Sequence, residues 1–312
     1  MTAAAGGGGG GGGGRWRLVV GVIAFALWAP PSLVGLPCAA LLAVSPDRSA
    51  RTRISAALLG ATSLALLALP GGRLAGVIAA YTVLVTAAFV AGTLLAPAGF
   101  LRQALRAVGA GGAATALLVQ LVWGSSGWGA LAWEATREAG RTMRFIVELR
   151  PDAFTLYEPV VRFVSATTPG MLALQSLAGL ALAWQWHILL GAQPLGAPLA
   201  PFRQFRIGDG WVWGLVAWLG LLVAPVSAVL KVAGANLGFV LGALYVLRGA
   251  AIVASFAQAV GVSAVALVIA AVAAAALALP LLFLLPGLCT LGITDTWYQY
   301  RRRLAARRPN AT

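Results

Sequence analysis

The amino-acid sequence predicts an all-α fold: a polytopic transmembrane helical bundle of about eight spans (roughly six to nine), plus one interfacial amphipathic helix. Two observations support this prediction. Hydrophobic residues make up 60% of the 312 residues and charged residues only 10%, whereas an ordinary soluble domain contains roughly 25% charged residues. Long apolar runs also recur along the chain, and in hydrocarbon they must form helices because every backbone polar group needs a partner within the fold.

The strong positive charge indicates a membrane topology rather than a nucleic-acid partner. The formal net charge is +14, and the arginines stand in the tails and between the apolar runs, as juxtamembrane residues do. No basic face on a soluble domain accompanies them, so we expect the lipid bilayer of the cell inner (plasma) membrane as the surroundings, and no nucleic acid. Cys38 and Cys289 lie within apolar runs and His187 is the single histidine, so we expect neither a metal site nor a cofactor.

The chain is expected to form one transmembrane domain between two polar tails. Residues 1–14 are rich in glycine and have no side chains that build a core, which predicts a disordered tail. The domain is expected over 15–300, and 301–312 forms a basic tail. The apolar runs that predict the spans are 18–44, 54–69, 74–96, 110–124, 169–191, 211–230, 232–258 and 264–289.

Prolines interrupt the first and last of these runs. Run 18–44 contains Pro30, Pro31 and Pro37 and forms either one kinked span or a tight hairpin. Pro280 and Pro286 are expected to bend or end run 264–289.

The choice at 18–44 sets the topology. With one span there, the positive-inside rule keeps both tails cytoplasmic but leaves Arg203 and Arg206 outside. With a hairpin, the loop of Arg203 and Arg206 lies inside and the arginine cluster at 301–308 lies outside.

Residues 125–168 form the longest polar interruption between the apolar runs. On a helix their charged residues share one face, and the opposite face is mostly alanine. Opposite charges stand at helical neighbour spacing in the pairs Glu134–Arg137, Glu138–Arg141 and Arg144–Glu148. Two interpretations remain: a helix that lies in the membrane interface, or a docking surface for another protein.

Three glycines mark one face of the predicted span 232–258. Gly234, Gly238 and Gly242 are four residues apart, and the absence of side chains there favours close approach of a neighbouring helix.

Three residues are candidates for substrate binding. Asn236 and Arg248 stand in the same span as the glycines, and a charge near the centre of a span costs about 2.5 kcal/mol or more. Arg248 therefore either points into the bundle, towards an acid, carbonyls or a cavity, or extends to the nearer interface. His187 follows Trp184 and Trp186, which suggest an interfacial aromatic belt, with substrate contact as the alternative.

Further polar residues flank the last spans. Arg203 and Arg206 precede Asp209, which is placed to cap the helix that follows it. Asp295 closes the last apolar run and is expected to pair with arginines of the tail or to mark the helix exit. The predicted spans contain no aspartate or glutamate, and intramembrane hydrolysis needs such groups or a histidine site. We therefore expect no catalytic residues and no enzyme.

The order of these segments resembles the YybS-like family of multi-pass bacterial membrane proteins, whose members carry a domain of unknown function. The resemblance covers about residues 202–303 and is carried by the basic stretch that ends at Asp209, by Ala235–Gly249 and by Leu291–Arg303. Arg248 departs from the family pattern, in which a glutamine precedes the glycine.

The resemblance implies a role in small-molecule transport. The family has been grouped with the membrane-embedded substrate-binding components of energy-coupling-factor transporters, which work with an ATPase module and another membrane subunit. The sequence contains no P-loop motif, so active transport requires such partners. The alternative is a non-transporting membrane scaffold that recruits envelope or cell-division partners through 125–168 and the basic tail.

Overall fold

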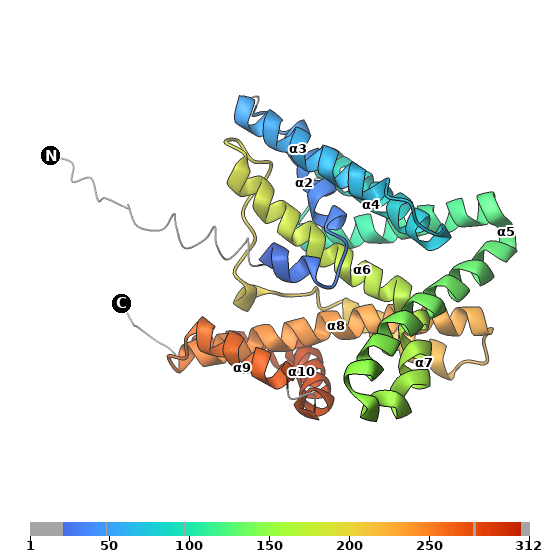
Figure 1. Cartoon of the computed structure of the whole chain (residues 1–312). Coiled ribbons are helices and arrows are strands. Elements are labelled where there is room, and N and C mark those ends of the chain that lie inside the picture. Colours follow the sequence, from blue (N-terminus) through green and yellow to red (C-terminus); the bar gives the residue numbers. More distant parts are fainter. Residues whose placement is uncertain (1–20, 48, 97, 277–278, 307–312) are drawn as a thin grey trace. The chain divides into compact units, whose positions relative to one another are not determined.

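The computed structural model describes residues 21–47, 49–96, 98–276 and 279–306, and within these ranges the regular elements are helices (Figure 1). The predicted all-α class is confirmed. The glycine-rich tail expected at 1–14 lies outside the described residues. The chain divides into two compact units, Met1–Ser165 with Leu172–Leu199 and Ala166–Met171 with Ala200–Thr312. These are called unit 1 and unit 2, and each is described by itself.

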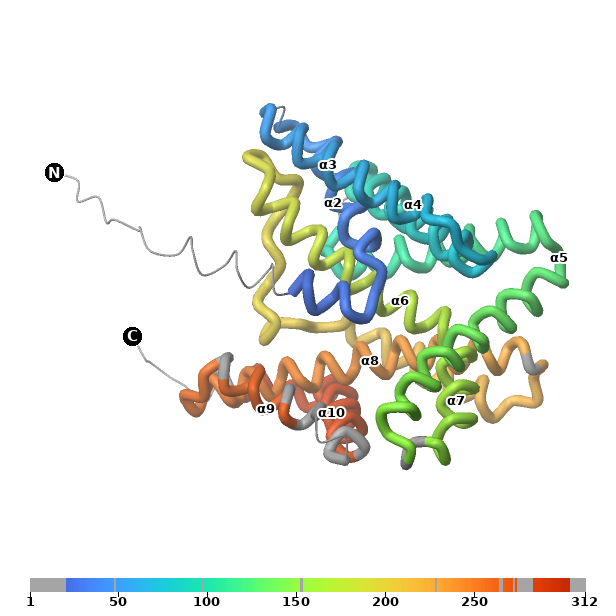
Figure 2. Tube along the Cα trace, viewed as in Figure 1, coloured from blue at the N-terminus to red at the C-terminus, as the bar shows by residue number. Residues whose placement is uncertain are grey.

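Unit 1 consists mainly of long helices joined by short turns, as the backbone trace shows (Figure 2). Its regular elements are α2 (Ser32–Val44), α3 (Ala50–Leu67), α4 (Arg73–Leu95), α5 (Phe100–Leu149), η1 (Pro151–Leu156) and most of α6 (Tyr157–Leu190).

The prolines break run 18–44 in two. Residues 21–26 are helical, the chain turns, and α2 begins at Ser32 with Pro31 as its N-cap. Since 13 residues of α-helix extend about 20 Å, α2 alone is shorter than the ~30 Å hydrocarbon layer.

A kink at Gly124 divides α5. Gly124 has φ 61°, a left-handed value that glycine adopts without a steric penalty. The helix before the kink starts at Phe100 rather than at residue 110. The helix after it continues to Leu149 and contains the first part of the predicted amphipathic segment 125–168.

Glu134 in this second half of α5 caps another helix. Its carboxylate accepts hydrogen bonds from the backbone N–H groups of Arg73 (3.3 Å) and Leu74 (2.7 Å) at the start of α4. The free amides and positive dipole of a helix N-terminus stabilise such a carboxylate. The predicted pairing of Glu134 with Arg137 is therefore replaced by a tertiary cap. The predicted pair Glu138–Arg141 is present at 3.2 Å between exposed side chains.

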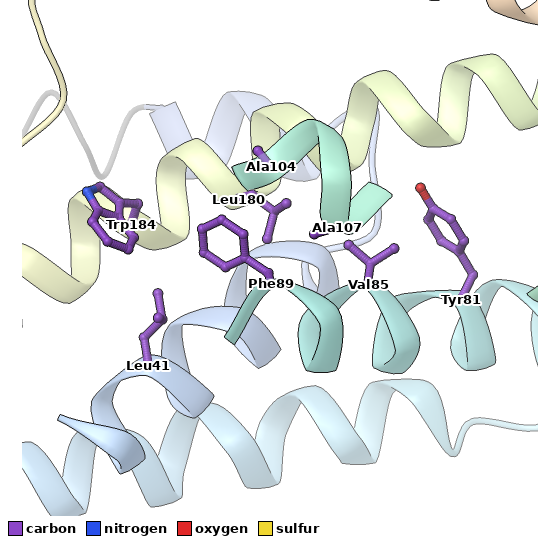
Figure 3. Packing of buried hydrophobic residues seen from close by; sticks show 8 residues of the cluster. All are labelled: Leu41, Tyr81, Val85, Phe89, Ala104, Ala107, Leu180 and Trp184. Atoms are coloured by element: carbon purple, nitrogen blue, oxygen red, sulfur yellow. The ribbon is translucent and has the colours of Figure 1, made fainter. Parts of the chain in front are cut away.

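The core of unit 1 is built where α2, α4, α5 and α6 meet (Figure 3). Leu41, Phe89 and Ala104 are fully buried, and Leu180 is nearly so. The rings of Phe89 and Trp184 meet edge to face at 6.0 Å, a favoured aromatic geometry.

Unit 2 carries the C-terminal part of the chain. Its regular elements are η2 (Phe202–Gln204), α7 (Trp211–Val223), α8 (Ala228–Ala259), α9 (Ala264–Ala276), α10 (Leu279–Tyr298) and α11 (Tyr300–Ala306). The run 264–289, which prolines were expected to bend or end, is described as two helices, α9 and the first half of α10, with residues 277–278 between them outside the described ranges. Pro280 falls in the first turn of α10, where a helix tolerates proline because the missing N–H is not needed.

The three glycines of the predicted stripe have different surroundings. A Cβ atom on Gly234 would lie 2.7 Å from the Leu221 side chain, and one on Gly238 would overlap the Trp218 indole, so both face α7. A Cβ on Gly242 would meet no atom within 4 Å.

The closest backbone approach in unit 2 joins α8 to α10 instead. A Cβ on Gly249 would overlap the carbonyl of Leu288, and one on Gly292 would overlap the carbonyl of Tyr245. The closest helix contact therefore lies at two glycines outside the predicted stripe.

Four described helical stretches are long and apolar enough to cross a membrane: Arg73–Leu95, Phe100–Leu149, Phe154–Leu190 and Val229–Ala259. Ser32–Val44 and Trp211–Val223 are shorter apolar helices. The number of spans stays a prediction.

Candidate functional site

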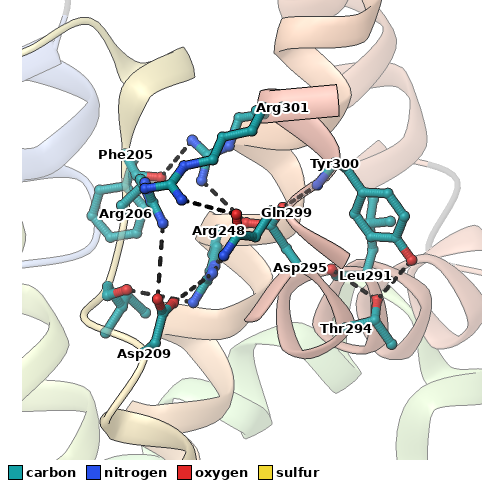
Figure 4. A network of polar contacts seen from close by, with 12 residues as sticks. Phe205, Arg206, Asp209, Arg248, Leu291, Thr294, Asp295, Gln299, Tyr300 and Arg301 are labelled. Carbon is teal, nitrogen blue, oxygen red and sulfur yellow. Dashed lines mark hydrogen bonds and ion pairs between the residues drawn. The ribbon is translucent and has the colours of Figure 1, made fainter. Parts of the chain in front are cut away.

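A network of ion pairs in unit 2 surrounds Arg248 (Figure 4). The Arg248 side chain is fully buried. Its Nε and Nη2 atoms each lie 3.1 Å from Oδ2 of Asp295, and Nη2 also lies 3.1 Å from Oδ1 of Asp209. Nη1 donates to the carbonyl oxygen of Ile207 at 3.4 Å. The expectation that Arg248 points inwards, towards acids and a carbonyl, is confirmed, and the alternative of an extended, interfacial side chain is wrong.

Asp295 is the buried anion of this network. Its side chain is 3% exposed, and Oδ2 is shared between Arg248 and Arg301, the latter at 3.4 Å. Oδ1 accepts a hydrogen bond from the backbone N–H of Tyr300 at 3.0 Å. Gln299, between α10 and α11, has φ 47°, a left-handed conformation that is uncommon outside glycine. This turn brings the start of α11 back onto Asp295, so the predicted pairing of Asp295 with the tail is present at Arg301.

Asp209 supplies the second, more exposed anion. Its side chain is 49% exposed, and Oδ2 lies 3.9 Å from Nη2 of Arg206. The prediction that Asp209 caps α7 is wrong, because Gly210 is the N-cap and no side chain bonds to the free amides. The carboxylate pairs with the buried guanidinium of Arg248 instead.

Arg301 joins the C-terminal tail to the loop before α7. Its Nη1 atom donates to the carbonyl oxygens of Arg203 (3.0 Å) and Phe205 (2.9 Å). The tail and this loop therefore lie at the same end of unit 2. Both expected topologies place them on opposite sides of the membrane, so this contact argues against both. Helices α9 and α10 together lead the chain away from the end of α8 and back to it.

An open pocket of about 760 Å³ lies beside the network. Four arginines and three glutamines line it, and Asp295 is the acidic residue among its described lining residues. Arg203 donates to Oε1 of Gln258, and Arg302 donates to Oε1 of Gln299 at 2.9 Å. The lining is thus polar, with several positive charges.

Asn236 lies outside the lining of this pocket. Its side chain is half-buried, its Oδ1 accepts from the N–H of Gly170 (2.7 Å), and its Nδ2 donates to the carbonyl of Ala166 (2.8 Å). In an uninterrupted helix those two backbone groups would bond to each other. Asn236 therefore joins α8 to the part of α6 that belongs to unit 2, next to Pro169, which lies inside the helix and has no backbone N–H to donate.

His187 belongs to unit 1 and is fully buried. Its Nε2 accepts a hydrogen bond from the N–H of Leu195 at 3.4 Å. Trp184, expected in an interfacial belt, is 8% exposed and is part of the core instead. Substrate contact by His187 stays a prediction.

Sequence reasoning missed Ser255, Gln258, Gln299, Arg301 and Arg302 as one group. Each is a polar residue near the end of a helix, and nothing in their spacing relates one helix to another. The available signal was weak: glutamines within or next to otherwise apolar stretches, close to arginines.

The fold and the polar site define a helical membrane protein with a basic pocket at one end of its C-terminal unit. Comparison with known families agrees with the membrane class: residues 155–296 match a family described as "Predicted membrane protein (DUF2232)". The matched stretch contains Asp209, Arg248 and Asp295. No curated protein and no solved structure matches the chain significantly.

Proposed function

We propose that the protein binds a small solute in the pocket of unit 2 and serves as the solute-binding subunit of a transport system in the cell's inner membrane. The observation that supports this most directly is the pocket itself. Its volume of about 760 Å³ falls within the range of roughly 300–1,000 Å³ of small-molecule sites.

Arg248 acts in this proposal as a positioning residue. Its donors are directed at Asp295, Asp209 and the carbonyl of Ile207, so they are not available to a solute. By these bonds it holds together the loop before α7, α8 and α10, which carry much of the pocket lining. A charge that is costly to bury is retained, on this view, because it fixes the shape of the site.

The proposed transport needs partners. The sequence contains no P-loop, and the resemblance described above implies an ATPase module and a second membrane subunit. Arg301 and Arg302 at the start of the basic tail line the pocket, so a partner that contacts these residues would act directly on the solute site.

The test is to identify what the purified protein retains. Full-length protein is extracted from membranes, denatured, and the released small molecules are measured by mass spectrometry. We expect a solute at close to one equivalent in the wild type. The Ser255→Trp variant, which fills the pocket, should lose it, and the Ser126→Trp variant in unit 1 should keep it. Equal retention by the two variants, or no retained solute in the wild type, would refute the proposal in favour of the scaffold.

A further inference from the structure

The polar network and pocket of unit 2 carry an excess of positive charge. Five arginines contribute to them, at positions 203, 206, 248, 301 and 302, against two aspartates at 209 and 295. The site therefore has a net excess of three positive charges. Such an excess attracts anions, and the walls of a cleft strengthen the field within it.

The five arginines differ in how far the protein already uses them. Arg248 is fully buried and bonded to two carboxylates and a carbonyl. Arg301 is 16% exposed and bonded to Asp295 and two backbone carbonyls. These two guanidinium groups hold the site together, and most of their N–H donors are already used in these bonds rather than free for a ligand.

Arg203, Arg206 and Arg302 are exposed and line the pocket. Arg203 and Arg302 each bond to a neutral glutamine oxygen, and Arg206 lies 3.9 Å from Asp209. A guanidinium has five N–H donors, so each of the three has donors beyond these contacts. The planar fork of a guanidinium matches the two oxygens of a phosphate or carboxylate group.

The acid in the pocket lining does not favour a cation. Both oxygens of Asp295 already accept bonds, Oδ2 from Arg248 and Arg301 and Oδ1 from the N–H of Tyr300. A metal ion or an amine would have to displace these donors and would face the surrounding arginines.

We propose that this pocket binds an oxyanion, with phosphate as the recognised group and Arg203 and Arg302 as the residues that contact it. The inference rests on the proposed function and names the substrate class. Two sources supply the same chemistry: a small phosphorylated solute and the phosphate of a lipid headgroup. Either ligand has access to this pocket, because the pocket is open and lies at the ends of the apolar helices α8 and α10, beside basic residues.

The experiment uses full-length protein in phosphatidylcholine nanodiscs. Binding of inorganic phosphate is measured by titration calorimetry at constant ionic strength. A second arm omits free phosphate and replaces part of the lipid by phosphatidic acid, and the shift in melting temperature is recorded. The site variant is Arg203→Gln/Arg302→Gln, and the charge-matched control is Arg141→Gln/Arg144→Gln on an exposed face of unit 1.

We expect the site variant to bind phosphate at least about tenfold more weakly for each arginine removed, since a hydrogen bond to a charged group contributes roughly 1.5–3 kcal/mol. The control should stay within about twofold of the wild type. Melting without ligand shows that both variants fold. Phosphate binding that depends on Arg203 and Arg302 supports a small solute as the source.

A shift with phosphatidic acid alone, lost in the site variant, supports the phosphate site with a lipid as its ligand and refutes the solute-binding function. Equal losses in the site and control variants, or no response in either arm, overturn the oxyanion proposal. A retained solute without an anionic group also overturns it, but leaves the proposed function standing.

Discussion

Replacing Asp295 by asparagine tests whether the buried ion pair stabilises unit 2. The change keeps the size of the side chain and removes the negative charge that lies 3.1 Å from two nitrogen atoms of Arg248. Because Arg248 is fully buried and Asp295 is 3% exposed, the guanidinium cannot turn to water for a replacement. Breaking a buried pair by removing one partner costs about 3–5 kcal/mol.

The structure favours the lower end of that range. Arg248 keeps Asp209 and the carbonyl of Ile207 after the substitution, so part of its charge remains balanced. We expect a loss of about 3 kcal/mol in the free energy of unfolding. The matched control is Asp209→Asn, which removes the other anion from the same guanidinium. Asp209 is 49% exposed, whereas Asp295 is 3% exposed, so water screens the Asp209 charge and we expect a smaller loss than for Asp295→Asn.

The assay is unfolding in a mild detergent, followed by the fluorescence of the 11 tryptophans. A double-mutant cycle with Arg248→Leu then isolates the coupling between Arg248 and Asp295, expected at about 1–3 kcal/mol. The double variant should be more stable than Asp295→Asn alone, because it no longer buries an uncompensated charge. Equal stability of the Asp295 and Asp209 variants, or additive effects in the cycle, would show that the buried pair contributes nothing specific.

Three further predictions concern the helix contacts, the pH response and the topology. Gly249→Ala should destabilise the protein by at least about 2 kcal/mol because the added Cβ overlaps the α10 backbone. Gly242→Ala, where the added Cβ meets open space, should be neutral or stabilise the protein by up to ~1 kcal/mol. Similar melting temperatures for the two variants would refute this prediction. Hydrogen bonds from Thr52, then from the N–H groups of Ser49 and Ala192, lower the pKa of Asp47 from its ordinary 3.8 to about 2. The stabilising contribution of the Asp47 carboxylate is therefore complete above about pH 4 and lost as the pH falls towards 2. The melting temperature of the wild type should fall more steeply with acid than that of Asp47→Asn. Parallel curves of melting temperature against pH would contradict this assignment. Reporters fused after residue 200 and after residue 312 should report the same compartment, because Arg301 bonds to the loop of Arg203 and Phe205; opposite compartments would refute the shared end.

The predictable part of the fold is the part that local physics determines. Apolar composition requires helices in lipid, and prolines and glycines mark helix breaks, as at Pro31 and Gly124. The inward direction of Arg248 also followed from a local quantity, the cost of a charge in the middle of an apolar helix. Such statements need no knowledge of which helices are neighbours.

The part that could not be predicted depends on contacts between distant residues. A glycine stripe indicates a surface that allows close approach, but it does not say which helix approaches. Gly249 of α8 and Gly292 of α10 (Leu279–Tyr298) lie together only because these two helices pack against each other in the folded chain. The carboxylate of Asp209 has two possible uses, a helix cap or a partner for Arg248, and the choice depends on a residue 39 positions away. The shared end of the tail and the loop likewise follows from α9 and α10 being two helices.

The two carboxylates that hold Arg248 also set an order of events during synthesis. Asp209 precedes the arginine by 39 residues and Asp295 follows it by 47. When α8 first enters the bilayer, Asp209 has already been made, while the buried partner is still several seconds of translation away at about 5–20 residues per second. In that interval the arginine depends on a half-exposed loop carboxylate. A chain stalled before Asp295 has emerged from the ribosome would therefore hold α8 less firmly in the membrane than the released chain, in which the last helices fix α8 in place.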